Sequence, residues 1–379
     1  RDAALYEMVI SEYIRTGNTL KLNQEQTLID KLIGACGDQK ALNILREAEY
    51  SFKNQWLFDY YRCLSLENVT QEAAKELLAL YDEATPREIP HGYDHLLNYV
   101  EADKNIIAKV IGLIITKTEK DQNFGCCLDM LFNHLTEINK RLFDLLEGDL
   151  TLIKKAYLTH CKSSQNADYN GATLSRILSA DPAFLSEIIE LQDYNSEWAN
   201  GRDYSFLWKH ENCEAIVEIA IKKILRINLS KGCFLGSYLE KLFCARSNTE
   251  CLPEIKEKQD NFLKNIIEEK SSDTDLMKLI FNLISEFKPD RRVQFIQLFI
   301  DNNNNYSEFE ALSFEPSHWT YGGSAVPHYQ ARVEYWSTLL PLFNTTDLLE
   351  HKLFIENTIQ RLRARVEQEK KSDFMEDME

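Results

Sequence analysis

Three stretches of the chain repeat one pattern of residue types around an Asp. Each has an apolar residue, a polar or charged residue, a small residue and the Asp, followed by two variable positions and two apolar residues. The pattern occurs at residues 100–110, 146–156 and 178–188, with Asp103, Asp149 and Asp181 at the common position. An Asp in this place predicts a helix N-cap, which stabilises a helix by about 1 kcal/mol. The apolar pair opens a stripe with helical spacing, so the pattern predicts three points at which one helix ends and another begins.

Repeated joints of this kind indicate a stacked array of helices. The chain is also poor in residues that turn the backbone: it has 13 Gly and 8 Pro among 379 residues, slightly under half of their usual combined share of about 12%. Sheet proteins and loop-rich enzymes need more turn residues than that. The spacing between the three Asp residues is uneven, so the repeats are degenerate. We therefore predict an all-α fold: a degenerate array of helical hairpins of the TPR or HEAT kind, forming an elongated or curved α-solenoid.

The sequence pattern divides this array into three segments. Pro86 and Pro90 interrupt the helical periodicity, so residues 1–85 form an N-terminal helical segment. Because the chain opens in a helix without an initiator Met, we expect that segment to continue from an upstream region. Residues 86–305 form the repeat array, and residues 306–379 contain an aromatic Gly/Pro loop followed by C-terminal amphipathic helices.

Capping residues and periodicity also predict individual helices. We expect a first helix over residues 3–16 and a second one capped by Asn23. Asp38 is expected to cap a long third helix that reaches about Leu64. After the Gly/Pro loop, Ser324 is expected to cap a helix through about residue 342, and a last amphipathic helix spans residues 347–371.

The charge balance argues against nucleic acid as a partner. The net charge is −17, whereas binding to a phosphate backbone depends on neutralisation by Lys and Arg. A basic cluster near the end of the chain is interrupted by Glu367 and Glu369, which is typical of a solvated helix face rich in ion pairs. Its members are Arg361, Arg363, Arg365, Lys370 and Lys371.

Cysteine usage and hydropathy point to a cytoplasmic protein. The chain has nine Cys, an odd number without a Cys-x-x-Cys motif, which favours free thiols in a reducing compartment over a disulfide framework. No secretory signal opens the chain, and no apolar run reaches the roughly 18 residues of a membrane span. We expect neither a membrane partner nor an extracellular location.

Motifs that carry chemistry are weak in this sequence. No phosphate-binding P-loop occurs. His91 and His95 have the spacing of a metal-ligand pair on a helix, but Gly92 separates them and no third ligand is near, so capping or surface roles are favoured. We therefore predict no catalytic, cofactor-binding or metal-ligating residues, and no enzyme activity for this chain.

Two aromatic groups lie where the helical periodicity fails. Loop aromatics that are not part of a core are frequent anchors of protein–protein contacts. The candidate partner-contact residues are Trp198, Tyr204, Phe206, Trp208, His318, Trp319 and Tyr321. The alternative interpretation is that these side chains are tucked into the helical array.

The last part of the chain resembles a known family. The residues that carry the resemblance are Phe314-Glu-Pro, a Trp, Gly-Gly-Ser-Ala-Val-Pro at 322–327, Arg332-Val-Glu-Tyr-Trp, Leu339-Leu-Pro-Leu and an Arg-rich last helix. Together they are similar to the C-terminus of bacterial anti-phage NTPases of the STAND class, over residues 314–373. In that family a C-terminal helical-repeat sensor recognises a phage protein such as a terminase or portal. Recognition drives oligomerisation and activates an N-terminal effector.

The resemblance implies a protein-recognition (sensor) module of a larger anti-phage defence NTPase. It implies a phage protein as partner, homo-oligomerisation through the parent protein, and ATP with Mg²⁺ bound in an upstream module. Two alternatives stay open. One is an architectural helical scaffold or oligomerisation domain without a ligand. The other is an enzyme that uses the loop from Trp319 to His328 with Glu308, Glu310 and Glu315.

Overall fold

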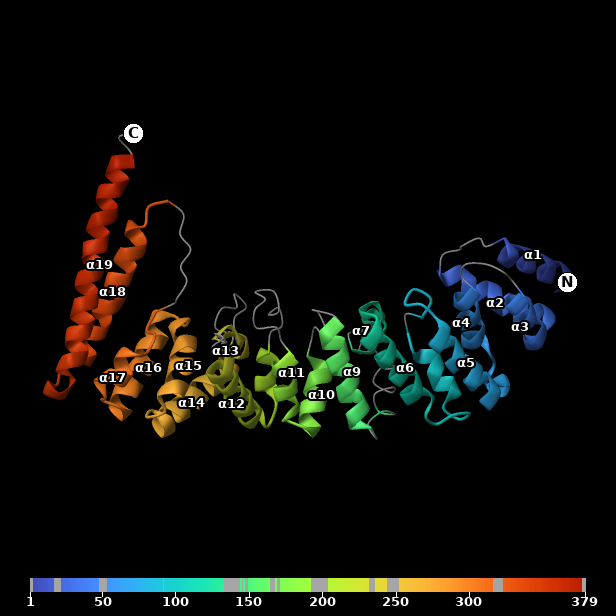
Figure 1. Ribbon diagram of the computed structural model, residues 1–379, viewed down its shortest axis with the longest axis horizontal. Coiled ribbons are helices and arrows are strands. Elements are labelled where there is room, and N and C mark those ends of the chain that lie inside the picture. The colour runs from blue at the N-terminus through green and yellow to red at the C-terminus, as the bar shows by residue number, and fades with distance from the viewer. Residues whose placement is uncertain are drawn as a thin grey trace. The chain divides into compact units, whose positions relative to one another are not determined.

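The computed structural model confirms the all-α prediction. It describes residues 3–16, 22–47, 53–90, 92–132, 144, 146, 149–163, 168, 171–191, 204–231, 236–243, 252–315 and 323–376. Every regular element in these ranges is an α-helix or a short 3₁₀-helix (Figure 1). The chain forms two compact units, residues 1–191 and residues 192–379.

Unit 1 is built from short helices that pack on their neighbours in sequence. Contacts join α1 to α2, α2 to α3 and α4, α5 to α6, α6 to α7 and α9, and α9 to α11. The α-helices are α1 (Ala3–Arg15), α2 (Leu22–Cys36), α3 (Asp38–Glu47), α4 (Lys53–Cys63), α5 (Gln71–Glu83), α6 (Ile106–Lys120), α7 (Gly125–Phe132), α9 (Leu150–Ser163), α10 (Ala172–Ala180) and α11 (Phe184–Leu191). Short 3₁₀-helices cover Leu66–Asn68, Asp94–Tyr99 and Gln122–Phe124.

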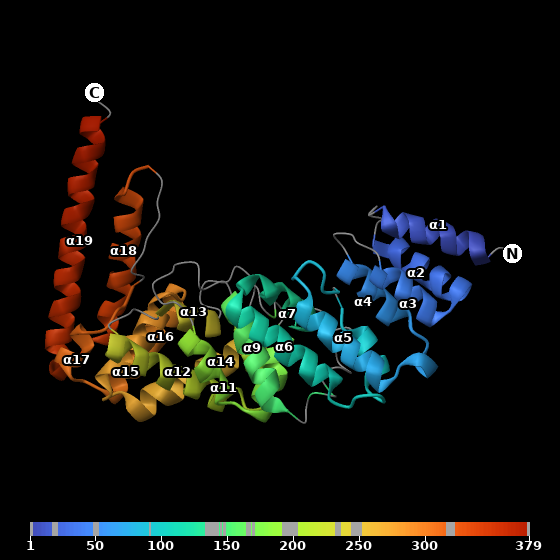
Figure 2. The ribbon, with the colours of Figure 1, turned by 45° about the vertical axis from the view of Figure 1, so that its right-hand side comes forward.

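Unit 2 continues with helices and ends in a hairpin. Its α-helices are α12 (Cys213–Lys231), α13 (Gly236–Leu242), α14 (Pro253–Lys270), α15 (Thr274–Ser285), α16 (Pro289–Asn302), α17 (Tyr306–Glu310), α18 (Val326–Leu339) and α19 (Leu349–Glu376). The 3₁₀-helices are Ser205–Lys209, Leu340–Leu342 and Thr346–Leu348. Figures 1 and 2 show α18 and α19 side by side and antiparallel. The Ser324 hydroxyl before α18 bonds to Asp373 near the end of α19, as this pairing requires.

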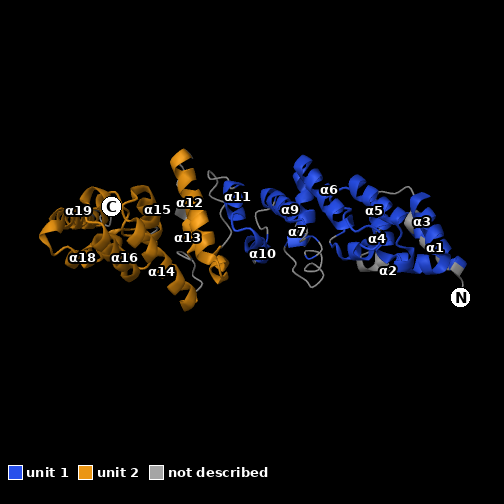
Figure 3. Ribbon diagram, turned by 90° about the horizontal axis from the view of Figure 1, so that it is seen from below, with its two compact units in different colours: residues 1–191 blue, residues 192–379 orange. Residues whose placement is uncertain are grey.

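The division between the units falls inside the segment predicted as the repeat array. Unit 1 ends at Leu191, whereas the predicted array runs from residue 86 to residue 305 (Figure 3). The predicted divisions after residues 85 and 305 stay predictions.

Of the three predicted Asp caps, one is an N-cap and two are turns. The Asp149 carboxylate accepts a hydrogen bond from Leu152 N at 2.9 Å, directly before α9, which confirms that cap. Asp103 and Asp181 instead accept from the N–H two residues ahead, at 3.0 and 3.1 Å. These two were wrong as N-caps because α6 and α11 begin later, at residues 106 and 184. Their side chains close a turn that leads into the helix.

The turn formed by Asp181 recurs at two positions that the sequence pattern missed. Asp121 and Asn303 also end one helix and accept the N–H two residues ahead with their side chains, both at 3.0 Å. Their backbone angles agree closely: φ/ψ is −142°/108° at Asp121, −143°/88° at Asp181 and −150°/106° at Asn303. Each also donates its own N–H to the carbonyl four residues back, at 2.7–2.8 Å. We call this arrangement the Asx joint.

Three predicted helix boundaries and the predicted Ser324 cap need correction. Asn23 lies inside α2, which begins at Leu22, so it is not a cap. The long helix expected between Asp38 and Leu64 is two helices, α3 and α4, and Asp38 is the first residue of α3. The last helix runs from 349 to 376, later than predicted at both ends. Ser324 Oγ accepts from Val326 N at 3.2 Å, but the N-cap position of α18 is Ala325, so Ser324 closes the turn before the helix and is not its N-cap.

A lysine of α6 closes the C-terminal end of α5. Lys117 Nζ donates to the carbonyls of Tyr81 at 3.0 Å, Ala84 at 2.8 Å and Asp82. It also lies 4.8 Å from the centre of the Phe124 ring. Burial lowers the pKa of Lys117. A helix leaves its last carbonyls unpaired and carries partial negative charge at that end, so the ammonium group stabilises the end of α5 and ties it to α6.

We expect Asp149→Ala to lower the free energy of unfolding by about 1 kcal/mol, because the first turn of α9 loses its cap. Urea denaturation followed by circular dichroism measures this change. Asp144→Ala is the control, since Asp144 is exposed and its ion pair with Arg176 lies at the surface. A decrease for Asp149→Ala no larger than that for the control would contradict the capping role.

We expect Lys117→Met to cost about 2 kcal/mol, because three carbonyls lose a charged donor. Lys120→Met changes an exposed lysine of the same helix and should alter stability by only a few tenths of a kcal/mol. Thermal and urea unfolding of both variants provide the comparison. Equal stability of the two variants would show that the three hydrogen bonds do not hold α5 to α6.

Candidate functional site

The closing hairpin of unit 2 is held together by an apolar seam. The stripe predicted for the last helix is confirmed, since all of its members are at most 7% exposed: Leu348, Ile355, Ile359, Leu362 and Val366. On α18 the buried residues are Tyr335, Trp336 and Leu339. Burial of these side chains is the main force that pairs the helices.

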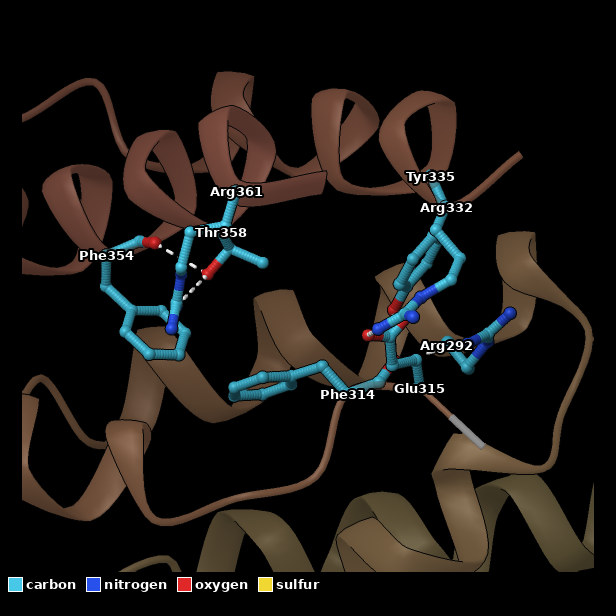
Figure 4. A network of polar contacts seen from close by, with 8 residues as sticks. All are labelled: Arg292, Phe314, Glu315, Arg332, Tyr335, Phe354, Thr358 and Arg361. Carbon is cyan, nitrogen blue, oxygen red and sulfur yellow. Dashed lines mark hydrogen bonds and ion pairs between the residues drawn. The ribbon is translucent and has the colours of Figure 1, made fainter. Parts of the chain in front are cut away.

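A buried arginine and a tyrosine hold the segment before α18 in place. Arg292 of α16 is 5% exposed and donates to Phe314 O at 3.2 Å, and Tyr335 of α18 donates to the same oxygen at 2.6 Å. The Arg292 guanidinium lies 4.2 Å from the centre of the Tyr335 ring. Burial raises the pKa of Tyr335 to about 12, so its hydroxyl stays a donor at neutral pH. Figure 4 shows α16 and α18 meeting at this carbonyl.

The next residue forms a two-point ion pair with α18. Arg332 donates from Nε to Glu315 Oε2 at 2.8 Å and from Nη2 to Glu315 Oε1 (Figure 4). The side chains are only 15% and 23% exposed, Glu315 and Arg332 respectively. The hydrogen bond to Glu315 raises the pKa of Arg332. This pair fixes the geometry of both groups and neutralises their charges.

Between α18 and α19 lies a groove of about 640 Å³, whose lining includes the Glu315–Arg332 pair. We call it the α18–α19 groove. Its floor contains Trp336, Thr358 and Leu362, which are at most 9% exposed. Arg361 and Arg365 line it with exposed side chains. The groove thus combines a largely apolar floor with a cationic rim.

The α19 side of the groove is centred on one face of the helix. Five of its residues are separated by alternating steps of four and three positions, the spacing that places side chains above one another on a helix. They are Phe354, Thr358, Arg361, Arg365 and Gln368, with Leu362 and Ala364 at the two edges. This face lies beside the apolar seam, so pairing of the two helices brings it against α18.

The two rim arginines contact neutral partners on their own helix. Arg361 donates to Thr358 Oγ1 at 3.1 Å, and Arg365 donates to Gln368 Oε1 at 3.2 Å. Within the described residues, no carboxylate forms an ion pair with Arg361, Arg363 or Arg365. The predicted ion-paired face is confirmed for Lys370, which pairs with Glu367 at 2.8 Å, whereas the three arginines form no such pair among the described residues.

A second groove of about 550 Å³ adjoins the first on a neighbouring strip of α19, towards α17. It shares Phe354 and Arg361 with the α18–α19 groove. Its remaining charged lining residues are Glu310 and Glu350, so its character is acidic. The two grooves therefore differ in charge.

The predicted partner-contact residues differ in whether the structure describes them and in how far they are buried. Trp198, His318, Trp319 and Tyr321 lie outside the described residues. Phe206 is half-buried. Tyr204 and Trp208 are 2% and 0% exposed, so their prediction as surface contacts needs correction.

Trp208 is buried because its whole ring finds partners in unit 2. Its indole Nε1 donates to Leu242 O at 2.6 Å. Its ring makes edge-to-face contacts with Phe243 and Phe262, with centroids 5.1 and 5.5 Å apart. A break in helical periodicity marks a loop but does not say which way the loop side chains face. Tyr204 and Trp208 therefore follow the alternative interpretation, in which the loop aromatics pack against the helices and do not contact a partner.

Residues considered for chemistry have structural contacts. His95 is buried, and its Nε2 lies 3.0 Å from the Tyr81 hydroxyl, whereas His91 lies outside the described residues. Glu315 is bound by Arg332. In the described part of the chain, no three His, Cys, Asp or Glu side chains gather in a group that could hold a metal ion. None of the described helices has both the length and the apolar character needed to cross a membrane.

Comparison with known proteins gives no relative: no family model, no curated protein and no solved structure matches the chain.

Sequence reasoning missed Trp336, Phe354 and the groove as a whole. The cluster of Arg361 and Arg365 was visible, and so was their spacing. Their role depends on the apolar floor beside them and on their forming no ion pair among the described residues, and neither can be read from α19 alone.

The buried His95 makes stability depend on pH. Burial, aided by the positive charge of Arg62, lowers its pKa to about 4 from 6.5. Between these values the unfolded chain binds a proton that the folded chain does not, so stability is full above about pH 6.5 and falls towards pH 4, by up to about 1.4 kcal/mol per pH unit.

We expect His95→Gln to flatten this part of the pH profile, as measured by urea denaturation between pH 4 and pH 7. Other groups contribute equally to the wild type and the variant, so the difference between the two curves isolates His95. Parallel curves would show that His95 does not carry the effect.

Proposed function

We propose that this chain is a protein-recognition module, a helical array of the TPR or HEAT kind that binds another protein. The observation that supports it is the α18–α19 groove, with an apolar floor and a cationic rim whose arginines form no ion pair with any described carboxylate. Protein interfaces favour this combination, since Arg and aromatic residues are enriched among the residues that contribute most to binding energy.

The specific form of the proposal follows from the resemblance of residues 314–373. The chain acts as the sensor of a larger bacterial anti-phage defence NTPase in the cytoplasm. It binds a phage protein, such as a terminase or portal, and binding triggers oligomerisation and effector activation. ATP and Mg²⁺ belong to an upstream module in this scheme. The residues of the resemblance include Glu315, Arg332 and Trp336, which line the groove.

One observation favours the alternative of a scaffold or oligomerisation domain. Leu5, Met8 and Val9 of α1 are 51%, 62% and 56% exposed. Their spacing places them on one face of the helix. An apolar face of this kind suits association with another helix, which a scaffold needs and a sensor does not.

The first test is capture of a partner. The chain is immobilised and exposed to lysates of phage-infected and uninfected bacteria, and mass spectrometry identifies what is retained. We expect one phage protein at near-equal stoichiometry, retained only from infected cells. Retention of nothing but the chain itself would favour the scaffold.

The second test is the mass of the isolated chain in solution, measured by light scattering coupled to size exclusion. The sensor predicts a monomer in the absence of ligand, whereas the scaffold predicts a stable oligomer. Leu5→Glu with Met8→Glu is then informative, because it should dissolve a scaffold oligomer and leave a sensor monomer unchanged.

A further inference from the structure

We infer that the α18–α19 groove binds an acidic helical segment of a partner protein. Two carboxylates of the segment, one helical turn apart, pair with Arg361 and Arg365, and an apolar side chain of the segment contacts the floor formed by Trp336 and Leu362. This inference rests on the proposed protein-recognition function and specifies the chemistry of the partner.

Charge complementarity selects an anionic partner. The whole chain has a net charge of −17, yet among the described residues the side chains of Arg361 and Arg365 donate hydrogen bonds to the neutral Thr358 and Gln368 and form no ion pair. A third cation of the groove, Arg332, is already neutralised by Glu315. The two rim guanidinium groups therefore keep donors for carboxylates, with which Arg forms strong two-point hydrogen bonds.

The spacing of the two arginines fits a helix. Arg361 and Arg365 lie four positions apart on α19, which corresponds to about 6 Å along the axis. Acidic residues four positions apart on a partner helix have the same separation, so the two rows can pair when the helices lie alongside each other. An apolar residue on the adjacent face then reaches the floor, where Trp336 and Leu362 are 4% and 6% exposed.

The aromatic residues of the groove are arranged for packing rather than for stacking on a nucleotide base. The Trp336 ring is surrounded edge-to-face by Phe314, Tyr335 and Phe354, with centroids 6.0–6.1 Å apart. A base needs an open aromatic face, and Trp336 is 4% exposed. The shape of the floor thus favours aliphatic side chains over nucleobases.

The neighbouring groove towards α17 adds selectivity. The second groove shares Arg361 but contains Glu310 and Glu350, which repel an acidic segment. Repulsion at the wrong site is an ordinary source of specificity. An acidic helix is therefore directed to the α18 side of α19.

The test uses a fluorescein-labelled acidic amphipathic peptide about four helical turns long, with Glu at positions four apart and Leu on the adjacent face. A matched peptide carries Lys in place of Glu, and a single-stranded DNA oligonucleotide represents the nucleic-acid alternative. Binding to the full chain is measured by fluorescence anisotropy. We expect the acidic peptide to bind with an affinity that falls as salt rises, and the Lys peptide not to bind.

The decisive variant is Arg361→Glu with Arg365→Glu, which should weaken binding of the acidic peptide about tenfold or more, because two attractive contacts become repulsive. Arg363→Glu is the matched control: it reverses the same charge on the same helix, but Arg363 is not part of the groove lining. It should change the affinity by no more than about twofold. All three arginines are exposed, and circular dichroism checks that the variants fold.

Several outcomes would overturn the inference: no binding of the acidic peptide, an equal loss in Arg363→Glu, or tighter binding of the oligonucleotide through the same two arginines. Repeating the partner capture with the double variant separates this inference from the proposed function. If the double variant retains the partner equally, the protein-recognition function is supported and binding through the α18–α19 groove is rejected. Peptide binding that needs both arginines, with no partner captured, would support the groove and reject the function.

Discussion

The Asx joint pairs the backbone groups that would otherwise lack hydrogen bonds where one short helix ends and the next begins. Each α-helix leaves unpaired carbonyls at one end and unpaired N–H groups at the other. At Asp121, Asp181 and Asn303, one residue serves both ends, because its N–H bonds to the helix before it and its side chain accepts from the turn that follows. No Gly in a left-handed conformation is needed at these three positions. This fits the scarcity of Gly in the chain, and it allows α-helices to follow one another after three or four residues.

Side chains with polar ends join helices that are further apart in sequence. In unit 1, Tyr99 donates to Tyr61 O at 2.8 Å, and Lys117 closes the end of α5. In unit 2, Trp208 donates to Leu242 O. In each case a backbone carbonyl accepts a hydrogen bond from the side chain of a different helix. The apolar parts of these side chains fill the space between helices, so one residue contributes both burial and a hydrogen bond. This dual use explains why so many of the large aromatic residues lie in the core.

The sequence allowed the fold class to be predicted because helix ends are governed by local chemistry. Asp149 shows this well: its cap involves only residues three positions apart. Prediction failed where tertiary contacts decide. One helix was predicted between Asp38 and Leu64 because α3 and α4 have a similar spacing of apolar residues. No local sequence signal marks the point where the two helices fold against each other. Trp208 was predicted to be an exposed loop aromatic, because its contacts with Phe243 and Phe262 depend on the tertiary fold. The groove needed the pairing of α18 with α19, since neither helix alone has both the floor and the rim.

The Asx joint also bears on how such a chain can change during evolution. The two hydrogen bonds that define the joint are local: the Asx N–H donates four residues back, and its side-chain oxygen accepts two residues ahead. A segment that begins and ends at two joints therefore carries these hydrogen bonds with it. Asp181 and Asn303 also bond to Lys154 and to Ser271 O, and only these longer-range contacts would have to be replaced after duplication or deletion of such a segment in the gene. The number of helices can thus vary, while the closing hairpin, whose groove depends on contacts between two particular helices, has to be inherited as one piece.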